Sequence, residues 1–133
     1  MRFYIASRLG NYEQVRRLAG MLKQAGWVHT YDWTVHDLNV IPDLKMLKSI
    51  GRDEFQGVKD ADVVIVLSPQ GRGTHVELGM AIALNKAVYI CHEDAAYFQR
   101  SENNSAFYWL PNVKHFVGTV DALAKQLRAE YCS

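Results

Sequence analysis

Five consecutive apolar residues follow Asp62 in the segment Asp62–Leu67 (DVVIVL), and they predict a strand that is buried on both faces. The loop Ser68–Thr74, which contains two glycines, comes next. An apolar pattern after this loop predicts a helix over His75–Asn85. A doubly buried strand joined to a helix by a short loop is typical of a parallel sheet covered by helices. The feature therefore points to the α/β class of folds.

The same alternation continues along the chain. Strands are expected at Arg2–Ala6, Trp27–Tyr31, Asp62–Leu67, Ala87–Cys91 and Val113–Val117. Helices are expected at Tyr12–Ala25, Asp43–Lys59, His75–Asn85 and Val120–Glu130, with looser connections at Asp32–Pro42 and Glu93–Pro111. The sequence thus predicts one domain over residues 1–133, a flavodoxin-like or Rossmann-like three-layer sandwich with a five-stranded parallel sheet of order 2-1-3-4-5.

Several residues are expected to begin or bury these helices. Asn11 with Gln14, and Thr74 with Glu77, fit capping boxes, while Thr119 is expected to cap the last helix. Pro42 is expected at the start of the second helix. The apolar stripe of that helix is expected to be buried, and its members are Leu44, Leu47, Ile50, Phe55 and Val58.

The composition is that of an ordinary globular domain of 133 residues with a formal net charge of +1. This charge gives no electrostatic reason to bind a nucleic acid polymer or an anionic membrane, and no apolar run reaches the roughly 18 residues of a membrane span. The chain begins directly in a strand, and its cysteines, Cys91 (expected in the core) and Cys132 (expected to be exposed), are unpaired in the pattern. A cytoplasmic location follows as an expectation. No metal or cofactor is expected, because the histidines have no ligand spacing.

Ligands of such sheets bind at the carboxyl ends of the strands beside the switch point, here the first and third strands. Those ends carry Ser7 and Arg8 and the loop Ser68–Thr74. Free backbone N–H groups at Gly71, Gly73 and Thr74, together with Arg8 and Arg72, suit a phosphate. The loop has no P-loop lysine, and no G-x-G-x-x-G follows the first strand, so ATP and NAD are disfavoured.

Two carboxylates near this edge allow more than one interpretation. Glu77 is expected in the first turn of its helix, where the helix dipole favours the ionised form that a nucleophile or base needs. Its alternative role is only to cap the helix. Glu54 borders the apolar stripe, so it is either half-buried with a raised pKa or turned to solvent.

The aromatic residues also have alternative roles. Trp33, beside Tyr31 and Asp32, would either stack on a base or cover the end of the sheet. The cluster Phe107–Trp109 (FYW) fits a lid, a subunit interface or core cover.

Three segments form a combined pattern: Phe3–Ser7 (FYIAS), Ala61–Val66 (ADVVIV) and Gly73–Lys86 (G-T-x-x-E-L-G-x-A-x-A-x-x-K). The pattern resembles the nucleoside 2-deoxyribosyltransferase family, whose superfamily includes nucleoside 5′-monophosphate N-glycosidases. The resemblance covers Arg2 to Ile90. It implies that Glu77 is the nucleophile, that Glu54 is the acid that contacts the base, and that Tyr4 orients the nucleophile, although the family's Y-[LF]-x-G is Tyr4-Ile5-Ala6-Ser7 here.

The resemblance also implies a substrate and an assembly. The loop before the motif carries Arg72 instead of the family's additional acid, which favours an anionic substrate. The family forms homodimers or larger homo-oligomers in which a neighbour completes the pocket, a role for which Asn104 and Ser105 are candidates. The candidate substrate-binding residues are Ser7, Arg8, Trp33, Ser68, Gly71, Arg72, Gly73 and Thr74.

The predicted function is cleavage or transfer of the N-glycosidic bond of a nucleoside or nucleoside 5′-monophosphate, through a covalent glycosyl-enzyme on Glu77. The alternatives are a non-catalytic module that binds nucleotides on the same fold, and a structural role in which Glu77 only caps its helix.

Overall fold

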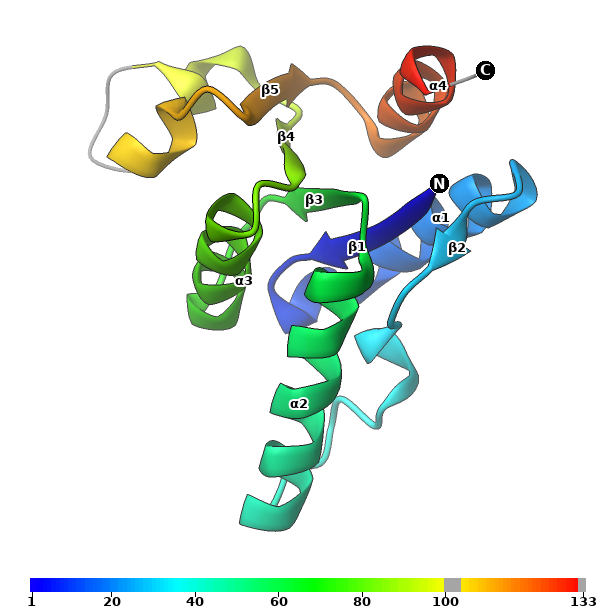
Figure 1. The fold of residues 1–133 in the computed structure, drawn as a ribbon, viewed down its shortest axis with the longest axis vertical. Helices are drawn as coiled ribbons and strands as arrows, with labels where there is room; N and C mark the ends of the chain where they lie inside the picture. Colours follow the sequence, from blue (N-terminus) through cyan, green and yellow to red (C-terminus); the bar gives the residue numbers. More distant parts are fainter. Residues whose placement is uncertain (100–103, 132–133) are drawn as a thin grey trace.

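The computed structural model describes residues 1–99 and 104–131, so the prediction for Cys132 lies outside the described residues. Its five strands are all parallel and have the order β2-β1-β3-β4-β5 (Figure 1). They are β1 (Arg2–Ala6), β2 (Val28–His29), β3 (Val63–Leu67), β4 (Ala87–His92) and β5 (Val113–Val117). The predicted α/β three-layer fold and strand order are confirmed.

Two helices cover each face of the sheet (Figure 1). One face carries α1 (Tyr12–Gln24) and α4 (Val120–Glu130), and the other carries α2 (Leu44–Asp60) and α3 (Arg72–Ala83). Four short 3-10 turns complete the description: η1 (Leu9–Asn11), η2 (Trp33–Val35), η3 (Ala95–Phe98) and η4 (Ala106–Trp109). The right-handed crossovers leave the carboxyl ends of β1 and β3 open to a ligand.

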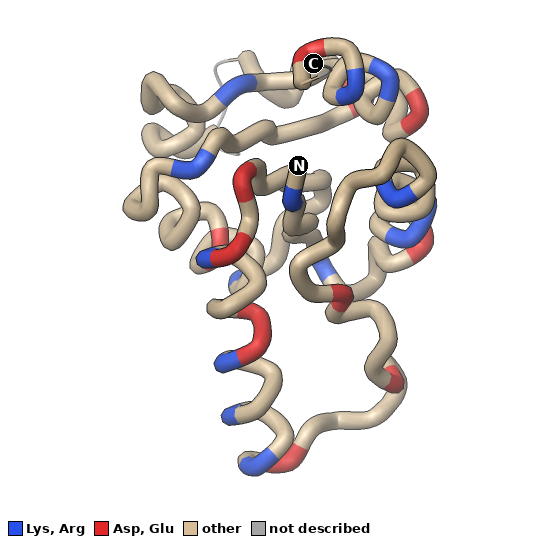
Figure 2. The backbone as a smooth tube through the Cα atoms, turned by 45° about the vertical axis from the view of Figure 1, so that its right-hand side comes forward, with Lys and Arg blue, Asp and Glu red and all other residues tan. Residues whose placement is uncertain are grey.

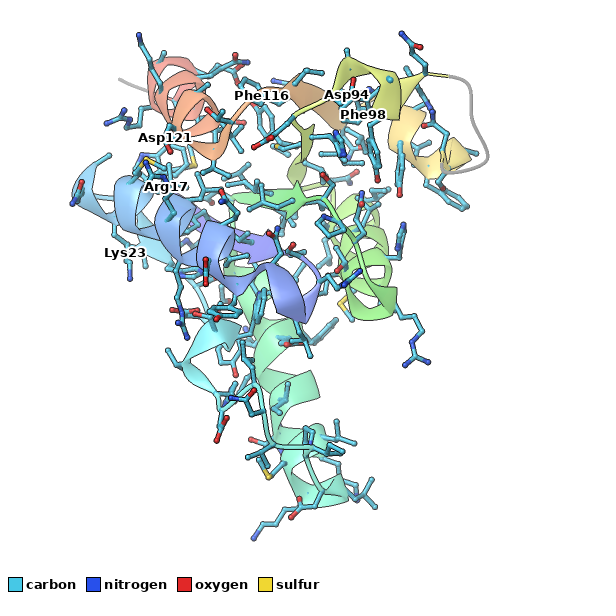
Figure 3. The ribbon with its side chains drawn as sticks, turned by 180° about the vertical axis from the view of Figure 1, so that it is seen from behind. Arg17, Lys23, Asp94, Phe98, Phe116 and Asp121 are labelled. Carbon is cyan, nitrogen blue, oxygen red and sulfur yellow. The ribbon has the colours of Figure 1, made fainter. Side chains whose placement is uncertain are left out.

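The face with α1 and α4 is closely packed. Leu18 and Leu22 of α1 and Leu127 of α4 are fully buried. At the surface, Arg17 makes a bidentate contact with Asp121, with both N–O distances 2.7 Å, and so joins the two helices (Figure 3). The cap predicted for α4 is correct, because Thr119 Oγ1 accepts the Ala122 N–H.

The two predicted capping boxes are wrong. Asn11 makes no cap, because its Nδ2 donates to Ser7 Oγ (2.9 Å) and Ser68 O (3.3 Å) and links the ends of β1 and β3. Helix α3 begins three residues earlier than predicted, with Gly71 as N-cap. Thr74 is then the third helical residue, and its Oγ1 accepts the Gly71 N–H (3.0 Å), the back-bond that Glu or Gln makes in a capping box. Glu77 is therefore free of any capping role.

The burial of helix α2 differs from its prediction, although its limits are shifted by only one residue. Asp43, and not Pro42, caps its start by accepting the Met46 N–H. Its stripe is largely exposed, with Leu44 at 68% and Leu47 at 51%, and only Val58 is buried. The first turns of α2 extend beyond the sheet (Figure 1), where Leu44 and Leu47 are exposed.

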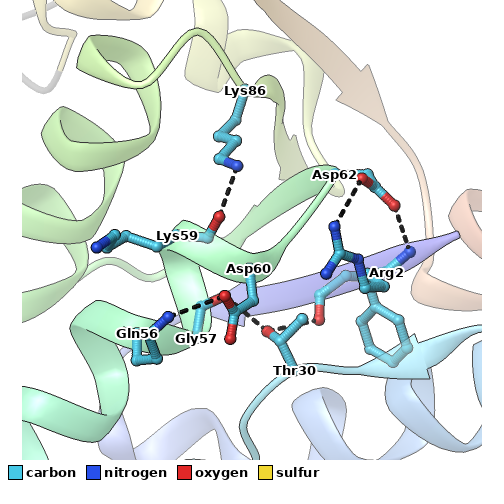
Figure 4. Close-up of polar contacts among 9 residues, drawn as sticks. Arg2, Thr30, Gln56, Gly57, Lys59, Asp60, Asp62 and Lys86 are labelled. Carbon is cyan, nitrogen blue, oxygen red and sulfur yellow. Dashed lines mark hydrogen bonds and ion pairs between the residues drawn. The ribbon is translucent and has the colours of Figure 1, made fainter.

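The carboxyl-terminal turns of α2 are held firmly against the sheet. Thr30 Oγ1 donates to Gly57 O (2.7 Å) and Phe3 O (3.2 Å), which ties α2 to β1 just after the short strand β2 (Figure 4). Lys86 Nζ donates to Lys59 O (2.7 Å) from the other side. The end of α2 thus has a fixed position over β1. Among the described residues, no helix has both the length and the apolar composition to cross a membrane.

Candidate active site

The side chain of Glu77 lies in the second turn of α3, on the face of the sheet covered by α2 and α3, and is only 7% exposed. It accepts a hydrogen bond from the hydroxyl of Tyr4, which is fully buried in the middle of β1. Burial and the neighbouring carboxylates raise the pKa of Tyr4, so that its hydroxyl remains a donor. Glu77 of the sequence motif on α3 and Tyr4 of β1 are therefore in direct contact.

Gly57 makes this meeting possible. A Cβ atom at Gly57 would lie 2.8 Å from Tyr31 Cβ and 2.9 Å from Tyr4 Cδ2, closer than carbon atoms approach. The absence of a side chain lets α2 approach β1 and pack against the Tyr4 ring. Sequence reasoning overlooked this residue, because a single glycine inside a helical pattern signals nothing until its neighbours are known.

Glu54 lies one turn before Gly57 on α2 and is half-buried, as one of its two predicted alternatives required. Burial raises the pKa of its carboxyl. Its negative charge also contributes to the raised pKa values of Tyr4 and Glu77, so the three groups interact electrostatically. Two carboxyls in different environments thus share one end of the sheet.

Glu77 lies in the second turn of α3 and not, as predicted, in its first turn. Burial raises its pKa from the usual 4.5 to about 8, a shift that the Tyr4 hydrogen bond opposes and the charge of Glu54 increases. The helix dipole acts mainly on the first turn, and Glu77 is beyond it. Burial thus opposes ionisation of Glu77, whereas the Tyr4 hydrogen bond favours it.

The loop before α3 lies against Arg8, which follows the end of β1. The Arg8 N–H donates to Pro69 O (3.1 Å), and a Cβ atom at Gly71 would lie 3.6 Å from Arg8 Cγ, so the ends of β1 and β3 are adjacent. The side chains of Arg8 and Arg72 are exposed, as is Gly73 at the amino-terminal end of α3. These exposed groups were predicted to bind a phosphate, whereas the Gly71 N–H, predicted for the same role, is bonded to Thr74 Oγ1 instead.

Other predicted binding residues have structural contacts. Ser7 Oγ donates to Leu67 O (2.9 Å), and the Ser68 N–H donates to Cys91 O (3.1 Å). The Thr74 hydroxyl is engaged with Gly71 and is buried. The side chains of Ser7 and Thr74 and the backbone of Ser68 thus hold the loop in place.

Trp33 does not present a stacking surface. It is 4% exposed, and its indole N–H donates to Ile5 O (2.8 Å), so it covers the end of the sheet. Asp32 caps the following turn by accepting from the Thr34 N–H (2.9 Å). Tyr31 is the partly exposed aromatic near Glu54, and its hydroxyl contacts His36 Nε2. Tyr31 thus takes the place at the rim that the sequence suggested for Trp33.

The aromatic cluster of η4 is divided between core and surface. Tyr108 is buried, and its hydroxyl lies 2.8 Å from His75 Nε2. Phe107 and Trp109 are largely exposed on either side of it. In the ranges 1–99 and 104–131, no three His, Cys, Asp or Glu side chains are grouped so that they could hold a metal ion.

Comparisons with known proteins give the family and the fold of the chain. A family model described as nucleoside 2-deoxyribosyltransferase matches residues 3–125. The structure of the CMP N-glycosidase BcmB from Clostridium botulinum is similar, with a TM-score of 0.65 and 17% identity over 98% of this chain and 99% of that one. A conserved protein from Enterococcus faecalis has a TM-score of 0.56 and 15% identity over 98% of each chain. No curated protein matches the sequence significantly.

Proposed function

The chain belongs to the nucleoside 2-deoxyribosyltransferase family, and we propose that it cleaves or transfers the N-glycosidic bond of a nucleoside or nucleoside 5′-monophosphate. One observation carries the proposal: the buried Glu77 carboxyl receives a hydrogen bond from Tyr4 and interacts with a second half-buried carboxyl, Glu54. Paired carboxyls with different surroundings suit a reaction that needs both a nucleophile and a proton donor.

The reaction would proceed by double displacement. An oxygen of ionised Glu77 attacks C1′ of the sugar, the C1′–N bond breaks, and its electron pair leaves with the base. Glu54 in its protonated form donates a proton to the departing base, which the raised pKa of this carboxyl favours. Water or a second base then attacks C1′ and releases Glu77, so that the configuration at C1′ is retained.

Tyr4 supports the first step by stabilising negative charge on Glu77. Burial raises the pKa of Glu77, so a protonated Glu77 must lose its proton before it attacks; transfer of this proton to the Glu54 carboxylate, directly or through water, leaves Glu77 ionised and Glu54 ready to protonate the base. An anionic substrate does not help Glu77 to lose its proton. The hydrogen bond from the Tyr4 hydroxyl is therefore the main local interaction that favours the ionised form of Glu77. Tyr4 is therefore assigned to the orientation and activation of Glu77.

The exposed guanidinium groups of Arg8 and Arg72 and the start of α3 favour a substrate with a 5′-phosphate. The similar Clostridium botulinum protein is described as a CMP N-glycosidase, which makes CMP the first nucleotide to test. Tyr31, at the rim near Glu54, is the aromatic side chain available to contact the base.

The exposed stripe of α2 supports the predicted homo-oligomer. Leu44, Leu47 and Phe55 are large apolar residues on one helix, and a second copy of the chain would cover them. Three of the four basic residues of α2, Lys45, Lys48 and Arg52, precede its acidic residues Asp53, Glu54 and Asp60, and the fourth, Lys59, lies in the last turn (Figure 2). An antiparallel pairing of two α2 helices around a two-fold axis would thus join opposite charges.

Release of free base, followed by HPLC, tests the proposal. Wild type and the Glu77→Gln variant are incubated with CMP, the other common 5′-monophosphates and the parent nucleosides, in ribo and deoxy forms, with and without an acceptor base. We expect wild type to release base from at least one of them, and Glu77→Gln to be slower by at least about 10³-fold. The variant Glu54→Gln is assayed in the same way to test the role of Glu54. Its matched control is Asp53→Asn, which changes the exposed carboxyl next to Glu54.

A non-catalytic nucleotide-binding module is the second candidate, and the raised pKa of Glu77 favours it, because a protonated carboxyl binds without attacking. Under this alternative, no substrate is turned over, and wild type and Glu77→Gln bind nucleotides with equal affinity in a calorimetric titration. Full activity of a folded Glu77→Gln variant would exclude both the double displacement and the role of Glu77 in it.

A further inference from the structure

A cavity of about 750 Å³ lies at the carboxyl ends of β3 and β4, and it is lined by residues of α1 and α4 as well as by residues of α3, η3 and η4. Leu67, Cys91 and Leu123 contribute its apolar surface, and Asn11 and Gln14 of α1 line it as well. Tyr4, Glu54 and Glu77 are not among its lining residues. The cavity is therefore separate from the carboxyl pair, although the loop before α3 borders both regions.

The lining of this cavity is rich in hydrogen-bonding groups that carry no charge. Apart from the exposed carboxylate of Glu93, the polar side chains that line it within the described ranges are amides, hydroxyls and imidazoles, and no Lys or Arg is among them. Among the described lining residues, a phosphate would therefore meet no guanidinium or ammonium group, and it would meet the Glu93 carboxylate. The chemistry suits an uncharged ligand with several donors and acceptors.

Part of the wall is held rigidly. Tyr97 OH donates to Gln70 Oε1 (2.5 Å), and Tyr97 stacks on His92 with ring centroids 4.3 Å apart. Tyr108 OH lies 2.8 Å from His75 Nε2, and the rings of Tyr97 and Tyr108 are nearly parallel, at 22°. Fixed aromatic rings beside an oriented primary amide form a surface that suits a planar heterocycle.

We propose that this cavity is a second small-molecule site, which binds a free nucleobase or a similar uncharged heterocycle. Its volume falls within the range of small-molecule pockets, about 300–1,000 Å³. The aromatic side chains would contact the ring system, and the Gln14 amide and the carbonyl oxygen of the Asn11 side chain would bond its edge. Binding at this site does not require turnover at Glu77. The binding proposal can therefore fail while the proposed glycosyl chemistry is correct, and the reverse.

The test is calorimetric titration of the full chain with cytosine and with adenine, and with ribose and inorganic phosphate as separate ligands. Gln14→Trp places a large ring at the cavity from an exposed position of α1, and Glu13→Trp makes the same change one residue away, outside the lining. We expect a base to bind to wild type, to Glu13→Trp and to Glu54→Gln with similar affinity. Binding to Gln14→Trp should be at least tenfold weaker.

Three results would overturn the proposal. One is the absence of binding by any base at millimolar concentration, and another is binding of ribose or phosphate with no binding of bases. The third is binding that Gln14→Trp leaves intact and Glu54→Gln abolishes, since the base would then occupy only the face with the carboxyl pair. Circular dichroism of both tryptophan variants verifies that they are folded.

Discussion

The two faces of the sheet differ in how they are built. On the face with α1 and α4, Leu18, Leu22, Leu123 and Leu127 are all buried to within 1%. On the other face, α2 has 17 residues, and only Gly57 and Val58 of them are buried. Apolar burial on the first face contributes most of the stability, at roughly 25 cal/mol per Å² removed from water.

On the second face, buried polar groups lower the stability of the fold. Tyr4 and Glu77 are buried beside each other, and a buried carboxyl is unfavourable even when it is hydrogen-bonded. Natural proteins keep such groups mainly where chemistry requires them. The difference between the faces therefore separates the part of the molecule that stabilises the fold from the part proposed to act on substrate.

The largest expected effect is that of Glu77→Gln on the pH dependence of the free energy of unfolding. Glu77 has a pKa of about 8 in the folded chain and about 4.5 when unfolded, so the folded state binds more protons between these values. Stability should therefore fall as pH rises from 4.5 to 8, by on the order of 3–5 kcal/mol. Urea unfolding of Glu77→Gln should lack this fall, whereas Glu13→Gln, an exposed change on α1, should keep it. Parallel pH profiles of wild type and Glu77→Gln would contradict the assignment.

Leucine truncations compare the two faces directly. Leu127→Ala removes a fully buried side chain between α4 and the sheet, and should lower the free energy of unfolding by about 3 kcal/mol. Leu47→Ala, at a position that is 51% exposed on α2, should cost less than about 1 kcal/mol at concentrations where the chain is monomeric. A large, concentration-dependent loss for Leu47→Ala would instead show that a second copy covers α2.

Gly57→Ala examines the fixed end of α2. The new Cβ would collide with Tyr31 and Tyr4, and overpacking of this kind costs about 1–3 kcal/mol, which exceeds the gain in helix propensity. Gly51→Ala on the same helix meets no atom within 4 Å and should stabilise the chain by about 0.5–1 kcal/mol. Equal effects of the two substitutions in urea unfolding would contradict the close approach of α2 to β1.

The sequence predicted the first face better than the second. Strands β1 and β5 and helix α4 have their predicted limits, because buried apolar runs and a threonine cap are local signals. The stripe of α2 was correctly periodic, but periodicity identifies an apolar face without telling which molecule covers it. The start of α3 was misjudged because Gly71 caps a helix without a side chain, so no residue type marks it.

At the carboxyl pair, residue types could be predicted but not environments. Glu77 and Tyr4 were expected to interact from the family resemblance, and their hydrogen bond agrees with this. The raised pKa of Glu77 depends on burial by α2 and β1, which no local pattern contains. Trp33 and Tyr31 exchange roles for the same reason, since burial of either depends on where the chain turns after β2.

His29 should give the opposite pH dependence, with a smaller effect. It stacks on Phe3 with ring centroids 4.6 Å apart, on the side of β1 opposite to Tyr4, and neither of its buried ring nitrogens has a hydrogen-bond partner. Burial lowers its pKa from 6.5 to about 4. Its neutral form therefore stabilises the fold above pH 6.5, and this contribution, about 1–2 kcal/mol after allowance for its partial exposure, is lost as pH falls from 6.5 to 4. The Tm of His29→Leu should therefore change less with pH over that range than the Tm of wild type, whereas an unchanged slope would assign the acid sensitivity to other groups.

The two pH effects can be removed together. Stability is expected to fall toward acid through His29 and toward alkali through Glu77, so the double variant His29→Leu/Glu77→Gln should lose both slopes.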